Sequence, residues 1–325
     1  KEIVAIYRNN GNVATALPSL PAAVAGSSSK LVPHPPPKGG SGHSESCRLT
    51  FSINSGRTGS GYLAELLKLA SLELAVNHEA FPVMNGEVLQ TVKQRGLENS
   101  FALRRQSKIP AINAALRASP RNHYVETSHL FIKTFWDVVM REYESKCHIN
   151  IIVLRRYFPD VVHSLRRLDF DRQLPNWYYL PSDKMMSVLK TDYIFDDELD
   201  RIFGYLLDIE AQVQSFQERF TDVNLIEVRL EDLQTIEGAK YLFRRLGVKG
   251  LPSDAAIRRL VGTPKNTHGS THPGIESHEE ETMIIHRYRK FLQRCIDNGI
   301  TNLPAMPALT KIRSSLQFEM PVLKK

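Results

Sequence analysis

The sequence predicts an α/β protein with three layers, in which a central parallel sheet is flanked by helices. Two observations carry this prediction. Short runs typical of strands alternate along the chain with segments that repeat apolar residues at helical spacing, which is the pattern of parallel α/β units. The two strongest strand runs, Ile149–Leu154 and Asn224–Val228, are apolar and β-branched without alternation, as expected of strands buried on both faces.

The individual elements can be placed in order along the chain. We predict strands at 48–54 (RLTFSIN), 122–127 (NHYVET), 148–155 (HINIIVLR) and 223–229 (VNLIEVR), and a shorter β-like run beside His78. Helices are predicted at Ser60–Leu74, His129–Tyr143, Phe158–Leu168 and Glu198–Phe220. The last of these helices carries apolar side chains along one face, which predicts packing against the core.

Composition narrows the class of ligand. The chain of 325 residues is 42% hydrophobic, which is ordinary for a globular protein. It contains no run of about 18 apolar residues, so no membrane span is predicted. The net charge of +7 favours anionic ligands such as phosphates, nucleic acid or an acidic glycan, with a merely basic surface as the alternative.

The chain divides into three parts by composition. Residues 1–46 are rich in Ala, Ser, Pro and Gly, which predicts a flexible arm. We expect a globular domain at 47–300 and a tail at 301–325. The first residue is Lys rather than Met, so we expect a trimmed chain, and a removed anchor stays open. The arm would suit the stem of a Golgi enzyme, whereas the absence of N-x-[ST] sites suits the cytoplasm.

Cysteine and histidine usage predicts neither a disulfide framework nor a metal site. Cys47, Cys147 and Cys295 are odd in number and lack metal-type spacing, so we expect ordinary thiols. The stretch THGSTHPGIESH, at 267–278, contains three histidines without a tight ligand pattern.

The stretch SGRTGSG, at 55–61, joins the first strand to the first helix. A glycine-rich turn at this joint leaves backbone N–H groups available, and together with the helix dipole they favour an anion. Gly56, Gly59 and Gly61 would let the chain wrap a phosphate, while Ser60 adds a hydroxyl and Arg57 a forked cation. A tight turn without a ligand is the alternative. The stretch matches neither G-x-x-x-x-G-K-[ST] nor G-x-G-x-x-G.

SINSGRTGSGYLAELL resembles the 5′-phosphosulfate loop of the P-loop sulfotransferases, in which a strand, a short motif containing Lys or Arg, and a helix follow one another. The resemblance implies that Arg57 is the catalytic cation of the loop. It also implies that the phosphate is cradled by Thr58, Gly59, Ser60 and Gly61.

A second segment, IIVLRRYFPDVVHSLRRL, resembles the 3′-phosphate site of the same family. There an Arg at a strand end is followed eight residues later by a Ser, which here are Arg156 and Ser164. Pro159 is displaced by one position, and Arg155 is the alternative arginine. An Arg leaving a strand and a Ser on the next helix can hold one phosphate from two sides.

Two weaker matches complete the resemblance, which covers about Arg48 to Cys295. Glu231, Asp232 and Leu233 match a segment to which we assign a structural role. GTPKNTHGSTHPG resembles the late loop that closes over the cofactor, which implies phosphate contacts from Lys265 and Asn266, with a solvated loop as the alternative.

The family resemblance implies a reaction. The donor would be 3′-phosphoadenosine 5′-phosphosulfate (PAPS), which transfers its sulfuryl group in line to an acceptor hydroxyl without a required metal. Arg57 would stabilise charge on the leaving phosphate. The base that takes the hydroxyl proton is expected in AVNHEAFP, with Glu79 as first choice and His78 as second. His129 is a third candidate, for which core packing is the alternative.

Other functions remain open at this point. The acceptor would be a glycan or a small molecule, the basic net charge favours an anionic glycan, and we expect no nucleic-acid partner. A P-loop kinase-like phosphotransferase is one alternative, disfavoured by the missing Lys–Ser/Thr pair. A non-catalytic basic module for anions or glycans is another, but it predicts basic and aromatic residues interleaved on one face. The clearest basic residues instead follow two strands.

Overall fold

The computed structural model of the protein describes residues 47–119, 121–189, 195–261, 278–300, 303–306 and 309. The predicted arm, 1–46, lies outside the described residues, as does most of the predicted tail. The division of the chain into arm, domain and tail therefore stays a prediction.

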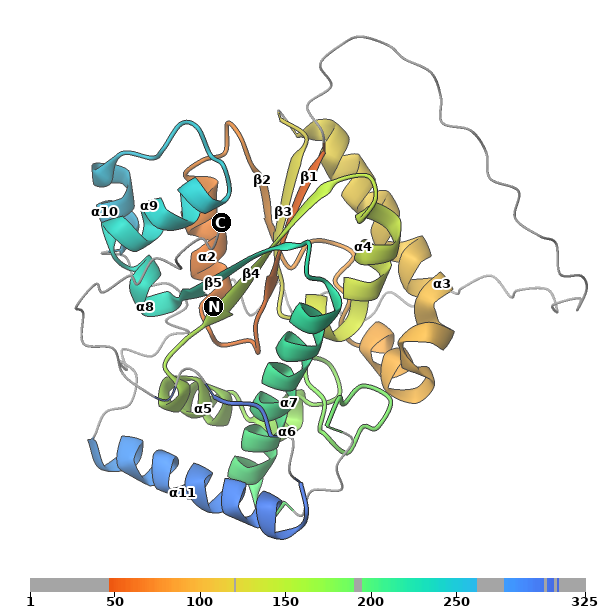
Figure 1. Ribbon diagram of the computed structural model, residues 1–325, viewed down its shortest axis with the longest axis vertical. Helices are drawn as coiled ribbons and strands as arrows, with labels where there is room; N and C mark the ends of the chain where they lie inside the picture. Colours follow the sequence, from red (N-terminus) through yellow and green to blue (C-terminus); the bar gives the residue numbers. More distant parts are fainter. Residues whose placement is uncertain are drawn as a thin grey trace, which may run out of the picture. The chain divides into compact units, whose positions relative to one another are not determined.

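A single sheet of five parallel strands forms the centre of the described part (Figure 1). Its order is β2-β3-β1-β4-β5, made from β1 (Arg48–Ile53), β2 (Ala75–His78), β3 (His123–Thr127), β4 (His148–Arg155) and β5 (Asn224–Arg229). Nearly all residues of β1, β3 and β4 are buried, because both faces of these strands are covered. The predicted parallel α/β class and the predicted strands are confirmed.

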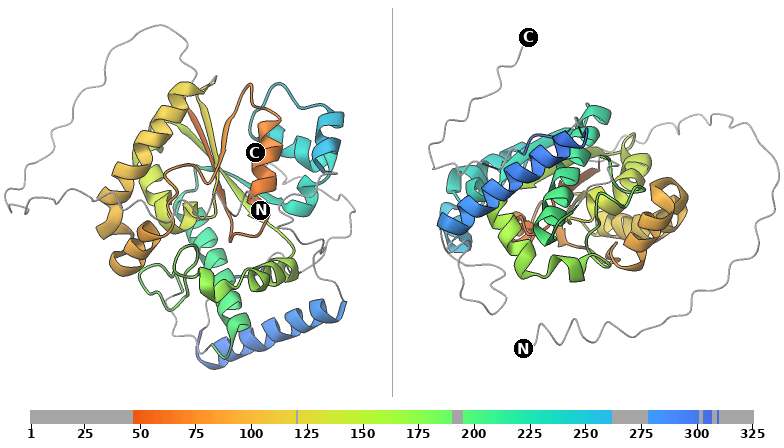
Figure 2. Two further views of the ribbon diagram at one scale, coloured as in Figure 1. Left: turned by 180° about the vertical axis from the view of Figure 1, so that it is seen from behind. Right: turned by 90° about the horizontal axis from the view of Figure 1, so that it is seen from below.

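Helices cover the two faces of the sheet (Figures 1 and 2). Phe51, Tyr124 and Ile151 contribute to the core on one face, and Val125, Ile152 and Ile226 to the core on the other. The first face is covered by α3 (Glu87–Ala118), η1 (Phe131–Phe135), α4 (Trp136–Tyr143) and α7 (Glu198–Arg219). The second is covered by α2 (Ser60–Lys68), α8 (Leu230–Leu233), α9 (Ile236–Arg245) and α10 (Asp254–Val261).

Three further helices extend the first layer. They are α5 (Phe158–Arg167), α6 (Phe170–Gln173) and α11 (His278–Asp297). α11 lies beside α5 and crosses one end of α7 (Figures 1 and 2), and Tyr288 on α11 packs its ring against Phe158 and Phe203. The three-layer arrangement predicted from the sequence is therefore present in the described part of the chain.

Two predicted helices differ in detail from the structure. The helix that begins at Ser60 ends at Lys68 rather than Leu74, because the chain turns there and exposes Leu72 while Leu74 remains in the core. The predicted helix His129–Tyr143 is a π-helical turn at Phe131–Phe135 followed by α4. π-helical turns are frequently found at functional sites.

The longest helix, α3, was not predicted from the sequence. It contains Pro110, and at Gly96 (φ 77°, ψ 171°) it is interrupted by a non-helical residue. Both residues break the local signal for a helix, and packing against η1 and α4 holds the two parts together. In the described part of the chain no helix, α3 included, is long and apolar enough to cross a membrane.

The expectation that all three cysteines are ordinary thiols is wrong. Cys47 and Cys147 form a disulfide with a Cα–Cα distance of 4.8 Å, while Cys295 is a buried free thiol. The two cysteines immediately precede β1 and β4, which pair in register from Arg48 with His148. Adjacent parallel strands thus bring together residues 100 positions apart, which spacing along the sequence does not show.

Candidate active site

The strand order locates a crevice at the carboxyl edge of the sheet. The chain passes from β1 to β2 at one edge of the sheet, returns to β3 beside β1, and then continues to β4 and β5 on the other side of β1. Ligands of open α/β sheets bind where the order reverses in this way, outside the carboxyl ends of the strands. Here the reversal lies between β1 and β4, which end in SGRTGSG and in Arg155–Arg156. Both predicted phosphate segments therefore meet at this edge.

The glycine loop has a conformation that requires its glycines. Gly56 and Gly59 have φ of 84° and 94°, in the left-handed region that disfavours side chains. A Cβ on Gly59 would lie 2.7 Å from a methyl carbon of Leu230 on α8. Gly59 also precedes α2 without a side-chain cap on the first helical turn, so the amides of that turn are free of the usual intramolecular partner.

Internal hydrogen bonds hold the loop in shape. The Asn54 side-chain oxygen accepts bonds from the Gly56 amide at 2.9 Å and the Thr58 hydroxyl at 3.2 Å. From α7, the Tyr205 hydroxyl donates to the carbonyl oxygen of Ser55. Because the hydroxyl of Thr58 is buried and already bonded, its backbone N–H is the group left for an anion.

The two predicted phosphate segments touch directly. Nε of Arg57 donates to the hydroxyl oxygen of Ser164 on α5 at 2.9 Å. One terminal guanidinium nitrogen of Arg156 donates to the carbonyl oxygen of Arg57 at 3.3 Å, and the other lies 3.4 Å from a carboxylate oxygen of Asp160. Arg57 and Ser164, which are 107 positions apart in the sequence, are thus in contact. Together with Arg156 they place two guanidinium groups and a hydroxyl close to one another.

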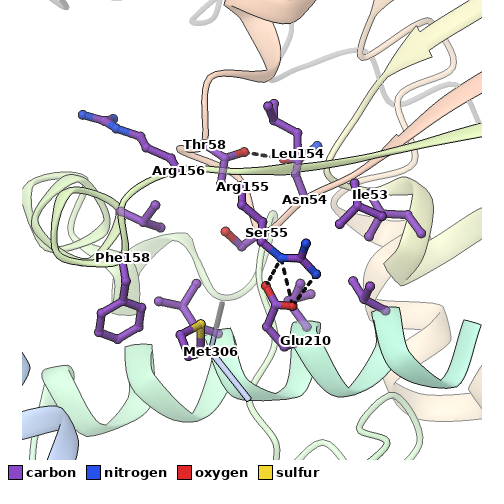
Figure 3. A pocket seen from close by; sticks show the side chains of 15 residues that line it. Ile53, Asn54, Ser55, Thr58, Leu154, Arg155, Arg156, Phe158, Glu210 and Met306 are labelled. Carbon is purple, nitrogen blue, oxygen red and sulfur yellow. Dashed lines mark hydrogen bonds and ion pairs between the residues drawn. The ribbon is translucent and has the colours of Figure 1, made fainter. Parts of the chain in front are cut away.

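The alternative arginine is engaged elsewhere. Arg155 forms ion pairs with Glu210 on α7 at 2.9 Å and with Glu227 on β5 at 2.7 Å. Figure 3 shows Arg155 and Glu210 paired in a cleft that is partly open to solvent, whereas Arg156 points away from them. Of the two arginines, the geometry therefore favours Arg156 for an anion, because Arg155 is already neutralised by two carboxylates.

The first-choice base, Glu79, lies just beyond the end of β2. Its carboxylate oxygen is 3.5 Å from Nε2 of His129, and its side chain is 21% exposed. Burial raises the pKa of Glu79 above its ordinary value, and the positive charges of His78, Lys133 and Arg57 offset part of that rise. A carboxylate with a raised pKa accepts a proton more readily at neutral pH, as a general base requires.

The second-choice base, His78, ends β2 on the exposed side. Its Nδ1 lies 2.7 Å from the carbonyl oxygen of Thr127, and since a carbonyl only accepts, Nδ1 carries the proton in the neutral ring. Nε2 is then unprotonated. His78 therefore stays a candidate beside Glu79.

Backbone conformation singles out two of the predicted residues. Four described residues other than glycine have positive φ, namely Arg57 (59°), Glu79 (48°), Asn122 and Asp169. Asn and Asp enter this region readily, but Arg and Glu rarely do. Strained residues of this kind concentrate at active sites, where surrounding structure holds them. The two outliers are the predicted catalytic cation and the predicted base.

Sequence reasoning missed the buried lysines that support Glu79. Lys108 on α3 donates to the carbonyl oxygens of Ala80 and Pro82, and it pairs with Glu126 on β3 at 2.7 Å. Lys133 on η1 lies 2.6 Å from Nδ1 of His129. The signal for Lys133 was its position inside the apolar stretch HLFIKTFW. Lys108 carries no local signal, because the helix that positions it was not predicted.

Three consecutive aromatic residues, Trp177–Tyr179, follow α6 and pack near the glycine loop. Trp177 stacks on the His129 ring at 5.7 Å, whereas Tyr179 is buried and donates to Asp208. Lys265 and Asn266 lie outside the described residues, so their roles stay predictions. Among the described residues no group of three or more His, Cys, Asp or Glu side chains could hold a metal.

Together, fold and site define a parallel α/β protein with a glycine-rich loop at its strand-order reversal. No protein-family model and no curated protein matches this chain. Among solved structures, the sulfotransferase domain from the Synechococcus PCC 7002 olefin synthase is similar over 81% of this chain and 98% of its own, at 14% identity and a TM-score of 0.44.

A second solved structure gives a similar result. The sulfotransferase domain from the curacin biosynthetic pathway is similar over 79% of this chain and 99% of its own, at 13% identity and a TM-score of 0.39.

Proposed function

We propose that this protein is a sulfotransferase that moves a sulfuryl group from PAPS to an acceptor hydroxyl. One observation carries the proposal, namely the contact of 2.9 Å between Arg57 of the glycine loop and Ser164 of α5. Because this contact joins the two predicted phosphate segments, one nucleotide with phosphates at its 3′ and 5′ positions can bridge them. A nucleotide triphosphate would leave the second segment without a role.

The residues of the site fit such a donor. The 5′ end would be held by the backbone of residues 57–61 and the uncapped start of α2. The 3′-phosphate would be held by Arg156 and Ser164, and Arg57 lies between the two groups. When bound, PAPS supplies the sulfuryl group and a good leaving group. The protein then has to position the donor and the acceptor, stabilise the charge on the leaving phosphate and remove the proton of the acceptor hydroxyl.

Each of these roles falls to a named residue. As the bond from the acceptor oxygen to sulfur forms, the bond from sulfur to the phosphate oxygen breaks, and negative charge grows on that phosphate oxygen. Arg57 stabilises this charge electrostatically, because a guanidinium does not give up its proton at neutral pH. The acceptor proton goes to Glu79, and the second product is adenosine 3′,5′-bisphosphate.

The acceptor and the compartment are also proposals. The net charge of +7 favours an acceptor that is itself anionic, such as an acidic glycan, over a neutral small molecule. The Cys47–Cys147 disulfide favours an oxidising compartment such as the Golgi lumen over the cytoplasm, since disulfides are rare where thiols are kept reduced.

The test compares nucleotide binding and sulfuryl transfer in the wild type and Arg57→Ala. We expect the wild type to bind adenosine 3′,5′-bisphosphate in preference to Mg-ATP and to label an acceptor from a panel with radioactive sulfate. Arg57→Ala should lower kcat by about 10²–10³-fold, the usual effect of losing one transition-state donor. The control is Arg258→Ala, which removes an exposed arginine of α10.

The other outcomes separate the alternatives. Preference for Mg-ATP would identify a kinase-like enzyme. Binding of a sulfated glycan without binding of either nucleotide would identify a basic binding module. Normal turnover by Arg57→Ala would remove Arg57 from the mechanism.

A further inference from the structure

Lys133 is a buried charge that the proposed mechanism does not use. Its side chain is 1% exposed. Its Nζ lies 2.6 Å from Nδ1 of His129, and it donates to the carbonyl oxygen of Trp177 at 3.0 Å. The same nitrogen lies 4.8 Å from the ring centre of Tyr178 and 5.2 Å from that of Tyr205.

These surroundings suit an ammonium group. An ammonium has three donors and no acceptor, and the neighbours offer a carbonyl oxygen, a ring nitrogen and two aromatic faces. Aromatic faces attract cations, most strongly where water is excluded. Burial lowers the pKa of Lys133 well below its ordinary value, and the carboxylate of Glu79 opposes that change. The contacts of Nζ favour the charged form and so oppose the effect of burial.

The charge of Lys133 determines where His129 carries its proton. If the ammonium donates to Nδ1, that ring nitrogen is an acceptor, and the proton of the neutral ring is on Nε2. Nε2 lies 3.5 Å from the carboxylate oxygen of Glu79, so a proton on Nε2 lies next to that oxygen. Burial and the Lys133 charge lower the pKa of His129 well below its ordinary value, which keeps the ring neutral.

The opposite arrangement is less consistent with the contacts. A neutral Lys133 amine could accept a proton from Nδ1 of His129, which would leave Nε2 unprotonated. Two acceptors, Nε2 and the Glu79 carboxylate, would then face each other unless Glu79 were protonated. A protonated Glu79 could not take the proton of an acceptor hydroxyl.

We propose that Lys133 is a positioning residue, which holds His129 as the Nε2–H tautomer and, through it, orients Glu79 as an ionised base. The proposal rests on the proposed function for the role of Glu79 but not for the tautomer. It assigns His129, the third candidate base, to orienting the base rather than to removing the proton. Lys133 would thus act like the outer-shell residues of metal sites, which orient a functional side chain and whose loss lowers activity although they touch no substrate.

The first measurement reads the tautomer directly. In wild-type protein labelled with ¹⁵N-histidine, we expect the His129 ring to show an unprotonated Nδ1 and a protonated Nε2 at neutral pH. In Lys133→Met this preference should weaken, because a thioether cannot donate to Nδ1. The control Lys146→Met removes an exposed lysine and should leave the His129 signals unchanged. A wild-type ring protonated on Nδ1 would overturn the proposal, even if Lys133→Met does not fold.

The second measurement is the pH profile of kcat/KM. The groups around the Glu79 carboxylate are Arg57 from the loop, His78 on β2, Glu126 on β3, His129, and Lys133 on η1, and Lys93 on α3 acts on Lys133 in turn. Lys133 lowers the pKa of Glu79, so removing it raises that pKa. The acidic limb of the profile should therefore move to higher pH.

The size of the loss separates positioning from damage to the donor site. We expect Lys133→Met to lower kcat/KM by roughly 10–100-fold at neutral pH, the usual range for such supporting contacts, with unchanged affinity for adenosine 3′,5′-bisphosphate. In a His129→Gln background the same substitution should add little, because the link is already broken. An unchanged acidic limb, or full additivity, would refute the proposal.

The experiments distinguish failure of the proposed role of Lys133 from failure of the proposed function. If the wild type transfers no sulfuryl group to any acceptor, the proposed function fails, while the ¹⁵N spectra still decide the tautomer. If transfer occurs but Nδ1 carries the proton, only the role of Lys133 fails.

Discussion

The candidate site has two halves that are built in different ways. The donor half consists of the glycine loop, Arg156 and Ser164, which come from two contiguous segments after the adjacent strands β1 and β4. The acceptor half gathers Glu79, His129 and the buried lysines from β2, η1 and α3. The donor half depends on backbone conformation, whereas the acceptor half depends on charges held away from water. Substitutions in the two halves should therefore have different effects on activity, nucleotide binding and stability.

The largest effect is expected from Glu79→Gln in the acceptor half. The amide cannot take a proton, so kcat should fall by about 10²–10⁴-fold, the range for loss of a general base. In the wild type, activity should be lost as pH falls through the raised pKa of Glu79, at a higher pH than an ordinary glutamate would give. A pH profile of kcat/KM measures both effects, and His78→Gln tests the second candidate in the same assay.

Glu79→Gln should lower activity without lowering the stability of the fold. The folded-state pKa of Glu79 is raised, so the folded protein binds its proton more tightly than the unfolded chain does. Keeping the carboxylate ionised therefore costs folding free energy at pH values above the folded pKa, and that cost disappears below the unfolded pKa. Glu79→Gln should unfold in denaturant at the same concentration as the wild type or a higher one. Loss of both stability and turnover would instead indicate a structural role.

The next largest effect is expected from Lys108→Met. Lys108 and Glu126 are each 1% exposed and pair at 2.7 Å, and removing one partner of a buried pair typically costs about 3–5 kcal/mol. The free energy of unfolding from urea titration measures the loss. The matched control is Lys108→Met with Glu126→Leu, which removes both charges and should recover most of the stability. Equal stability of the single variant and the wild type would contradict a structural role for this pair.

The residues proposed for the donor half could be named from the sequence because their signals are local. A strand end, three glycines and an arginine lie close together in the sequence. Arg156 directly follows β4, and Ser164 lies on the next helix, α5. Even so, only the structure distinguished Arg156 from Arg155, because Glu210 and Glu227 come from α7 and β5.

The acceptor half was only partly predictable. Glu79 was named from its segment, but its partners are remote, and α3, which carries Lys108, is broken by Gly96 and contains Pro110. The disulfide escaped prediction for the same reason, because it depends on which strands are neighbours. The local sequence predicts helices and strands, whereas tertiary contacts between these elements decide which charged side chains are buried.

The smallest effect is expected from Ser164→Ala in the donor half. The hydroxyl of Ser164 accepts one hydrogen bond from Arg57, and the helix around it does not depend on that bond. Loss of a single hydrogen bond to the nucleotide should weaken binding of adenosine 3′,5′-bisphosphate by about 1 kcal/mol, roughly fivefold. Calorimetric titration measures this, with Ser107→Ala, a partly exposed serine of α3, as the control. Stability and the acidic limb of the pH profile should stay unchanged, since no buried charge is altered. A shift in that limb would show that the two halves are coupled through Arg57, which faces both Ser164 and Glu79.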